Sequence, residues 1–232
     1  MTIIKRERSI VIACDVNLKL YERILKETAG METVGGYKLG FYLALRYGLP
    51  KLVKLARKYT DKPLIYDHQK AATDIPDTGE KFAEVCKNAG VDGVILFPHA
   101  GPETEKEWID AAKRFGLGVI VGGLMTHKGY LKSDGGYIDD DAVRSMYLNA
   151  AKQGVNEFVV PGNKPDKIAE IKNMLETEGV EPVFYAPGFI AQGGKISDAA
   201  KIAGKSWHAI VGRAVYEAKD IKNAVKELGA AL

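Results

Sequence analysis

Residues 93–121 read GVILFPHAGPETEKEWIDAAKRFGLGVIV, and this stretch decides the fold class. Two short apolar runs, Gly93–Phe97 and Gly118–Val121, flank a longer segment, Glu105–Phe115, whose apolar residues recur at helical spacing. Gly116 stands where the helix should stop, as glycine does at many helix C-termini. The apolar runs have the composition of strands buried on both faces, which is typical of parallel sheets. The stretch therefore predicts a strand, a helix and a second, parallel strand.

The same alternation extends in both directions to the ends of the chain. The apolar runs that we interpret as strands are Ile10–Cys14, Val34–Lys38, Leu64–Asp67, Gly93–Phe97, Gly118–Val121, Glu157–Val160, Val183–Ala186 and Ala209–Val211. Amphipathic segments between them include Lys51–Tyr59, Lys81–Ala89, Glu105–Phe115, Asp140–Gln153, Lys167–Glu178 and Ala214–Leu228. Eight strands, each followed by a helix, on 232 residues predict an α/β protein with the (β/α)₈ TIM-barrel fold. No Pro/Ser-rich linker interrupts the pattern, so we expect a single domain over residues 1–232.

One connection is longer than the others, between the strands that begin at Gly118 and Glu157. The excess lies around residues 125–138 and includes Gly129, Gly135 and Gly136. A long glycine-containing loop on the functional face of a barrel is typical of a lid or a binding loop. The alternative, a disordered surface excursion, is less favoured because Tyr130, Leu131 and Tyr137 give the loop side chains to pack.

Composition narrows the classes of partner. Lys plus Arg number 33 and Asp plus Glu number 30, a net charge of +3, which is too balanced to predict nucleic acid as the main partner. The apolar runs are too short to span a bilayer, and no signal peptide is evident. Two cysteines do not form a disulfide framework, and four histidines on separate segments lack metal-ligand spacing. We therefore expect a cytoplasmic protein that binds no membrane, no nucleic acid and no metal.

Charged residues follow the first three predicted strands, where barrel chemistry gathers. Asp15 follows the first strand, Lys38 ends the second, and Asp67 and Lys70 lie at and beyond the end of the third. Each residue alone could simply cap a helix or form an ion pair at the rim. Together, two acids and two lysines at one mouth favour a reactive site, because charges at the ends of buried strands are costly unless they are paired or solvated.

The loops after the last two strands carry a different signal. Residues 187–194, PGFIAQGG, are rich in glycine, and Gly212-Arg213 opens the final helix. Glycines allow the backbone N–H groups to approach an anion, and the arginine guanidinium offers two parallel donors. Ordinary helix initiation does not explain glycines and an arginine in adjacent loops, so we predict a phosphate-binding site.

Several motifs resemble one known family, the orotidine 5′-monophosphate decarboxylases. They are Ile-Ala-Cys-Asp ending at Asp15, Gly-Tyr-Lys-Leu-Gly around Lys38, Asp67–Lys70 with Asp74-Ile75-Pro76, the Pro187–Gly194 loop, and Ile210-Val211-Gly212-Arg213. They occur in the family's order along nearly the whole chain. The resemblance implies a carboxy-lyase that converts orotidine 5′-monophosphate to uridine 5′-monophosphate without a cofactor, in de novo pyrimidine biosynthesis. It also implies a homodimer with shared active sites.

The resemblance assigns a role to each matching residue. It implies that Lys38, Asp67, Lys70 and Asp74 form an alternating charge network at the reacting carbon, with Asp74 and Thr78 reaching into the neighbouring subunit's site. It implies that Asp15 holds the ribose and Thr126 the pyrimidine. The phosphate and the lid side of the base would be held by Pro187, Gln192, Gly193, Gly212 and Arg213.

The segment after the third strand departs from the family pattern. The family usually spaces these residues as Asp-x-Lys-x-x-Asp, whereas this chain has Asp67-x-x-Lys70-x-x-x-Asp74. In an extended strand, residues three apart point to opposite faces. Lys70 can therefore face Asp67 only if His68 and Gln69 form a bulge or the chain has already begun to turn.

Two alternatives remain at this point. One is a sibling barrel of the 3-hexulose-6-phosphate synthase or keto-gulonate-phosphate decarboxylase type, which needs Mg²⁺ and has a carboxylate ligand after the second strand. This chain has Lys38 there, and a cation is unfavourable in a metal-ligand set. The other is a non-catalytic barrel that only binds a phosphorylated ligand, which the altered spacing leaves open.

Overall fold

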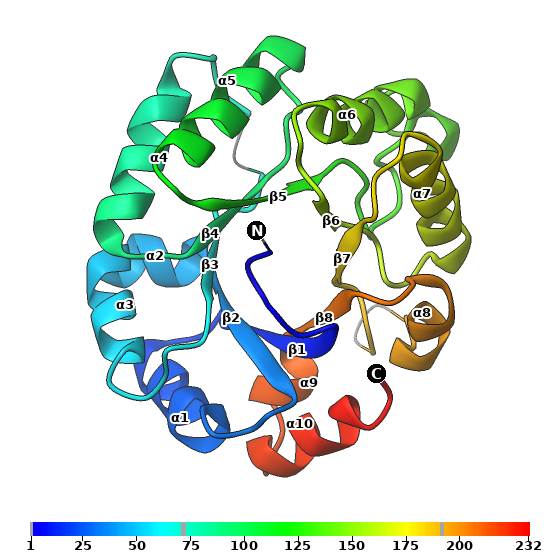
Figure 1. Cartoon of the computed structure of the whole chain (residues 1–232). Coiled ribbons are helices and arrows are strands. Elements are labelled where there is room, and N and C mark those ends of the chain that lie inside the picture. Colours follow the sequence, from blue (N-terminus) through cyan, green and yellow to red (C-terminus); the bar gives the residue numbers. More distant parts are fainter. Residues whose placement is uncertain (1, 71–72, 191–192) are drawn as a thin grey trace.

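The computed structural model describes residues 2–70, 73–190 and 193–232 and has the predicted TIM-barrel architecture (Figure 1). The strands are β1 (Arg8–Ala13), β2 (Val34–Gly40), β3 (Leu64–Asp67), β4 (Gly93–Leu96), β5 (Gly118–Gly122), β6 (Glu157–Val159), β7 (Val183–Ala186) and β8 (Trp207–Val211). Each strand pairs in parallel with the next, and β8 pairs with β1 to close the barrel. The fold class predicted from the sequence is confirmed.

The helices form a ring outside the barrel (Figure 1). They are α1 (Leu18–Thr28), α2 (Phe41–Tyr47), α3 (Leu49–Ala56), α4 (Thr78–Ala89), α5 (Pro102–Arg114), α6 (Asp140–Lys152), α7 (Pro165–Thr177), α8 (Ile196–Ile202), α9 (Arg213–Tyr216) and α10 (Ile221–Gly229). Among the residues described, none of these helices is long and apolar enough to cross a membrane.

Two connections differ from the predicted pattern of one helix per strand. Between β2 and β3 the chain forms α2 and then α3, separated by Gly48 with a positive φ of 78°. The predicted final helix is divided into α9 and α10, because the Asp220 carboxylate accepts a hydrogen bond of 2.8 Å from the Asn223 N–H and so starts a new helix. Side-chain capping of this kind competes with continuation of the preceding helix.

The N-terminal segment closes one end of the barrel. Ile4 belongs to the inner layer of apolar side chains, and Ile3 packs against that layer. In Figure 1 this segment crosses the middle of the barrel. We call Ile3 and Ile4 the plug. A Cβ atom at Gly118 would lie 2.2 Å from Ile3 Cγ1, so β5 needs glycine where the plug approaches. We call this end, with the side chains in contact with the plug, the floor, and the opposite end the mouth.

The predicted lid-like loop is partly ordered by its own contacts. It contains a 3₁₀ turn, η1 (Lys132–Asp134), and Leu131 forms a β-bridge with Ile138. Tyr130 is buried, whereas Tyr137 is 96% exposed. Two of the three side chains expected to pack therefore do so, and closure of the loop over the mouth stays a prediction.

Candidate active site

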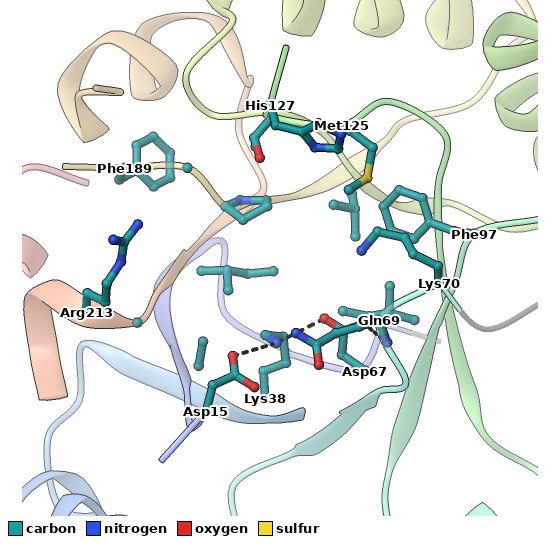
Figure 2. A pocket seen from close by; sticks show the side chains of 18 of the residues that line it. Asp15, Lys38, Asp67, Gln69, Lys70, Phe97, Met125, His127, Phe189 and Arg213 are labelled. Carbon is teal, nitrogen blue, oxygen red and sulfur yellow. Dashed lines mark hydrogen bonds and ion pairs between the residues drawn. The ribbon is translucent and has the colours of Figure 1, made fainter. Parts of the chain in front are cut away.

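A cavity of about 400 Å³ opens at the mouth, at the C-terminal ends of the strands (Figure 2). This volume lies within the usual range for small-molecule sites. The residues predicted for the site that line the cavity are Asp15, Lys38, Asp67, Lys70, Thr126, Pro187, Gly212 and Arg213. The fold therefore brings together side chains from both the charged side and the glycine-rich side of the barrel.

Lys38 stands at the centre of the charged side. The structure places it within β2, which continues to Gly40, and not at the strand's end as predicted. In the barrel register Lys38 lies beside Ala13 and Ile65, both of which point into the barrel. Its Nζ atom lies 3.0 Å from Asp67 Oδ2 and 3.5 Å from Asp15 Oδ2. One ammonium group thus joins the acids of two other strands.

Lys38 and Asp67 hold each other in their charged forms. Burial alone would lower the pKa of Lys38, but Asp67 and Asp15 outweigh burial and raise it above its ordinary value. Burial alone would raise the pKa of Asp67, but the Lys38 and Lys70 ammonium groups lower it. Opposite charges at hydrogen-bond distance can overcome desolvation in this way. The cavity wall therefore carries fixed charges of both signs.

The chain turns immediately after β3, and this turn answers the question raised by the unusual spacing. Gln69 and Lys70 have positive φ angles of 52° and 93°, which are uncommon for residues other than glycine. The Gln69 N–H donates a 2.8 Å hydrogen bond to Asp67 Oδ1, which fixes the start of the turn. Because the chain leaves the extended conformation here, Lys70 reaches the same cavity as Asp67.

The Lys70 ammonium lies against an aromatic part of the cavity wall. Its Nζ atom lies 4.5 Å from the centre of the Phe97 ring, at a distance typical of a cation–π contact (Figure 2). Burial lowers the pKa of Lys70; Asp67 partly opposes this and Lys38 adds to it. An ammonium with a lowered pKa gives up its proton more readily than an ordinary lysine.

The β5–α6 loop forms another wall, with Met125, Thr126 and His127 lining the cavity. The main chain of this loop is held from the loop after β6. Asn163 Nδ2 donates to the Thr126 carbonyl at 3.1 Å, and Lys164 Nζ donates to the Met125 carbonyl at 2.9 Å. Thr126 is thereby presented to the cavity by a tethered backbone.

The glycine-rich side contributes Pro187, Gly188 and Phe189 after β7, and Gly212 and Arg213 after β8. Arg213 is exposed and begins α9 at the rim. The Gly193 N–H donates to the Ile190 carbonyl, and Gly193 does not belong to the described cavity lining. Gln192, also predicted for this site, lies outside the described residues.

Asp74 and Thr78 lie apart from the cavity of their own chain. Neither belongs to the described lining, and Asp74 is exposed. The Asp74 carbonyl accepts a 2.8 Å hydrogen bond from the Thr104 hydroxyl, and the Thr78 hydroxyl donates to the Ile75 carbonyl at 2.8 Å. The structure thus separates these two predicted site residues from the other members of the network within one chain.

Sequence reasoning gave no individual role to several residues that line the cavity, including Gln69, Phe97, Met125, Phe189 and Tyr216. Phe97 and Met125 follow apolar strands and have the composition of core residues. Tyr216 lies three residues after Arg213, and residues three apart on a helix share a face. Its position beside the predicted phosphate-binding residue could therefore have been predicted from the sequence. Gln69 was predicted only to take part in a bulge or turn, and its place in the cavity depends on the left-handed form of that turn.

Across the described ranges, no group of three or more His, Cys, Asp or Glu side chains is arranged to hold a metal ion. Cys14 and Cys86 are free and buried.

Comparisons with known proteins agree over most of the chain. The model of the "Orotidine 5′-phosphate decarboxylase / HUMPS family" matches residues 9–228. A protein from Methanococcus maripaludis named "Orotidine 5′-phosphate decarboxylase" is 33% identical over 204 residues, covering 88% of this chain and 87% of its own. The protein of the same name from Methanocaldococcus jannaschii is 30% identical over 227 residues, covering 98% of this chain and 93% of its own.

Solved structures agree with the sequence relatives. The crystal structure of orotidine 5′-monophosphate decarboxylase from Methanocaldococcus jannaschii complexed with the inhibitor BMP has a TM-score of 0.84 and 28% identity, covering 98% of this chain and 99% of that chain. That of the Pyrococcus horikoshii enzyme has a TM-score of 0.78 and 26% identity, covering 96% and 98%.

Proposed function

The chain belongs to the orotidine 5′-phosphate decarboxylase / HUMPS family, and we propose that it converts orotidine 5′-phosphate to uridine 5′-phosphate and CO₂ with its own side chains alone. This is the carboxy-lyase reaction of pyrimidine biosynthesis. The observation that carries the proposal is the ion-paired Lys38, 3.0 Å from Asp67 and 3.5 Å from Asp15. The Mg²⁺-dependent sibling barrel would need a carboxylate ligand where this ammonium stands, and the names of the relatives favour the decarboxylase.

The chemical difficulty of the reaction is the negative charge left on a ring carbon. When the bond from that carbon to the carboxylate breaks, CO₂ departs and the electron pair stays on the carbon. The Lys70 ammonium stabilises this pair and then donates a proton to it, forming the new C–H bond. Two unit charges 4 Å apart interact by about 4 kcal/mol at an effective dielectric constant near 20, so one placed ammonium has a large effect. The lowered pKa of Lys70, caused first by burial, supports this role.

The acids act on the energy of the bound substrate before the reaction, and the phosphate-binding residues orient the substrate in the cavity. Asp67 lies against the substrate carboxylate and disfavours the bound ground state, while Lys38 holds Asp67 in its ionised form. Asp15 binds the ribose and Thr126 the pyrimidine. Pro187, Gln192, Gly193, Gly212 and Arg213 bind the phosphate and the lid side of the base. Binding energy at the phosphate is used to close residues 125–138 over the mouth and exclude water.

A single assay tests the reaction. Purified protein is mixed with orotidine 5′-phosphate in the presence of EDTA, and the decrease in orotidylate absorbance is followed. Turnover without a metal is the expected result. Turnover that appears only when Mg²⁺ and a sugar phosphate are supplied would indicate the sibling reaction. Binding of uridine 5′-phosphate with no turnover under either condition would indicate a non-catalytic barrel.

The active unit is a homodimer in which each mouth is completed by the other chain's Asp74 and Thr78. Both residues lie outside the described lining of their own cavity, which supports this arrangement. Large apolar side chains that dimerisation could cover follow the neighbouring strands β2 and β3. They are Phe41, Tyr42, Leu45 and Ile75, which are 43%, 43%, 75% and 59% exposed. An exposed apolar patch beside a site marks a contact surface, and the enzyme works in the cytoplasm as this dimer.

Subunit exchange tests the shared site. Lys70→Ala and Asp74→Ala proteins, each inactive alone, are mixed and allowed to exchange subunits. A mixed dimer contains one site with both residues intact, so part of the activity should return. No recovery despite demonstrated exchange would show that Asp74 acts within its own chain.

A further inference from the structure

Gln69 occupies an unusual position at the mouth. It is the first residue of the left-handed turn after β3, with φ of 52°, and it lines the cavity. Its N–H donates to Asp67 Oδ1 at 2.8 Å, and its side-chain oxygen Oε1 accepts a 3.1 Å hydrogen bond from the Phe41 N–H at the start of α2. Both ends of the residue are thus fixed, although its backbone conformation is costly for a residue with a side chain.

These contacts determine which way the carboxamide faces. Because Oε1 is directed at the Phe41 N–H, the Nε2 group, with its two donor hydrogens, must point to the other side. Figure 2 shows the Gln69 side chain extending from the turn toward Asp15 and Lys38. Lys38 is already paired with two acids, so the donor group of Gln69 is directed to the part of the cavity beside Asp15.

Asp15 offers the complementary group at the same place. Its Oδ2 atom contacts Lys38, but its Oδ1 atom is buried and has no hydrogen-bond partner among the described residues. Gly40 lies between the two side chains: a Cβ atom there would lie 1.8 Å from Asp15 Oδ1 and 3.3 Å from Gln69 Oε1. An unpaired buried acceptor is costly unless a ligand or water pairs with it.

We infer that Gln69 is a further substrate-binding residue, whose carboxamide accompanies Asp15 in binding a ribose hydroxyl group of the nucleotide. A hydroxyl is both donor and acceptor, so one ligand hydroxyl donates to the Asp15 carboxylate and accepts from Gln69 Nε2. Neither a methylene nor a carbonyl can make both bonds. The inference rests on the proposed function, because that function supplies a ligand with a ribose beside Asp15. It also gives the strained turn a role, since an extended chain would not bring Gln69 to this wall.

The test compares affinities for three ligands: uridine 5′-phosphate, its 2′-deoxy analogue and its 3′-deoxy analogue. Calorimetry is carried out on the wild-type dimer, on Gln69→Met and on Gln69→Glu. Gln69→Met removes both the donor and the acceptor. Gln69→Glu keeps an oxygen for the Phe41 N–H but removes the donor. Because the ratio of affinities is compared within each protein, the effect of the new charge on all three ligands cancels.

In both variants the ratio of the affinity for uridine 5′-phosphate to the affinity for the analogue that lacks the contacted hydroxyl should fall about 2- to 10-fold relative to the wild type, the range expected for one net hydrogen bond. In Gln69→Met, which adds no charge, affinity for that analogue should change less than 2-fold, because that ligand has no such bond to lose. The inference would be overturned if Gln69→Met weakened the binding of all three ligands equally and Gln69→Glu restored their affinities. Gln69 would then serve only as a tether of α2. A wild-type protein that binds none of the three would instead overturn the proposed function.

Discussion

The two ends of the barrel interior both contain buried polar groups, but the groups at the mouth form ion pairs, whereas those at the floor form hydrogen bonds and, among the described residues, no ion pair. At the mouth, Lys38 lies within ion-pairing distance of both Asp15 and Asp67. At the floor, Glu157 accepts hydrogen bonds from the Tyr185 hydroxyl at 2.8 Å and from the Ile3 N–H at 3.2 Å. Also at the floor, His208 Nδ1 lies 2.8 Å from the Ser9 hydroxyl.

At the floor, burial is the main cause of the pKa shifts, whereas at the mouth the attraction of opposite charges outweighs burial. Burial raises the pKa of Glu157 and lowers the pKa of His208 to about 4, so both shift toward their neutral forms. At the mouth, opposite charges hold Lys38 and Asp67 ionised despite burial. The difference teaches that burial alone does not mark a reactive site: mutual stabilisation of charges beside an open cavity does.

The largest expected effect on stability comes from breaking the mouth's central ion pair. Lys38→Met should lower the free energy of unfolding by about 3–5 kcal/mol, because Asp67 would remain buried without its cation. Urea denaturation measures the loss. The double variant Lys38→Met/Asp67→Asn is the control and should regain part of the loss, since the more deeply buried of the two unpaired carboxylates is then neutral. A loss below about 1 kcal/mol in the single variant would show that the pair is effectively solvated.

The next effect lies at the floor and depends on pH. The unfolded His208 binds a proton below about pH 6.5, whereas the folded one does so only near pH 4, so the wild type loses stability as pH falls through this window. The gap corresponds to about 3 kcal/mol. His208→Asn keeps a hydrogen-bond partner for Ser9 but does not titrate. Between pH 7 and pH 4, the variant should therefore lose about 3 kcal/mol less of its free energy of unfolding than the wild type loses.

Chemical denaturation of both proteins between pH 7 and pH 4 measures the difference in slope, in which the opposite contribution of Glu157 cancels. The pKa of Glu157 is raised on folding, so its contribution to stability rises as pH falls. Parallel curves for the two proteins would mean that the floor opens to water before His208 is protonated.

The smallest effect concerns the exposed rim of the mouth. Arg213→Ala should weaken binding of uridine 5′-phosphate by roughly 10- to 150-fold, the value of a charge-assisted hydrogen bond of about 1.5–3 kcal/mol. Binding of uridine should change little, because it has no phosphate. Calorimetry with both ligands decides the matter, and equal losses for the two would assign Arg213 to the fold. The free energy of unfolding of Arg213→Ala should be nearly unchanged, in contrast to the effects expected for Lys38→Met and His208→Asn.

The architecture was predictable because it follows from composition repeated eight times along the chain. Each strand is an apolar run such as Gly93–Leu96, and each neighbouring amphipathic segment has helical spacing. Parallel strands bring their C-terminal ends to one face, so Asp15, Asp67 and Arg213 could be placed at the mouth from the sequence. The register of β2 beside β1 and β3 also places Lys38 next to Asp15 and Asp67.

The remaining features depend on contacts that no local pattern encodes. The left-handed turn at Gln69 and Lys70 uses residues without glycine's preference for positive φ. The plug formed by Ile3 and Ile4 is too short to show a period, and His208 reads as an ordinary strand residue. The break between α9 and α10 depends on one capping carboxylate, that of Asp220.

The central claim is that the mouth's second ammonium, on Lys70, is the proton donor. Single-turnover rates with orotidine 5′-phosphate and dissociation constants for uridine 5′-phosphate are measured for the wild type, Lys70→Ala and Lys38→Ala. Lys70→Ala should reduce the rate by at least about 10²- to 10⁴-fold while product affinity stays within a few-fold, because the product carries no carbanion. Near wild-type turnover in Lys70→Ala, with a greater loss in Lys38→Ala, would contradict the claim and leave Lys38 as the acid.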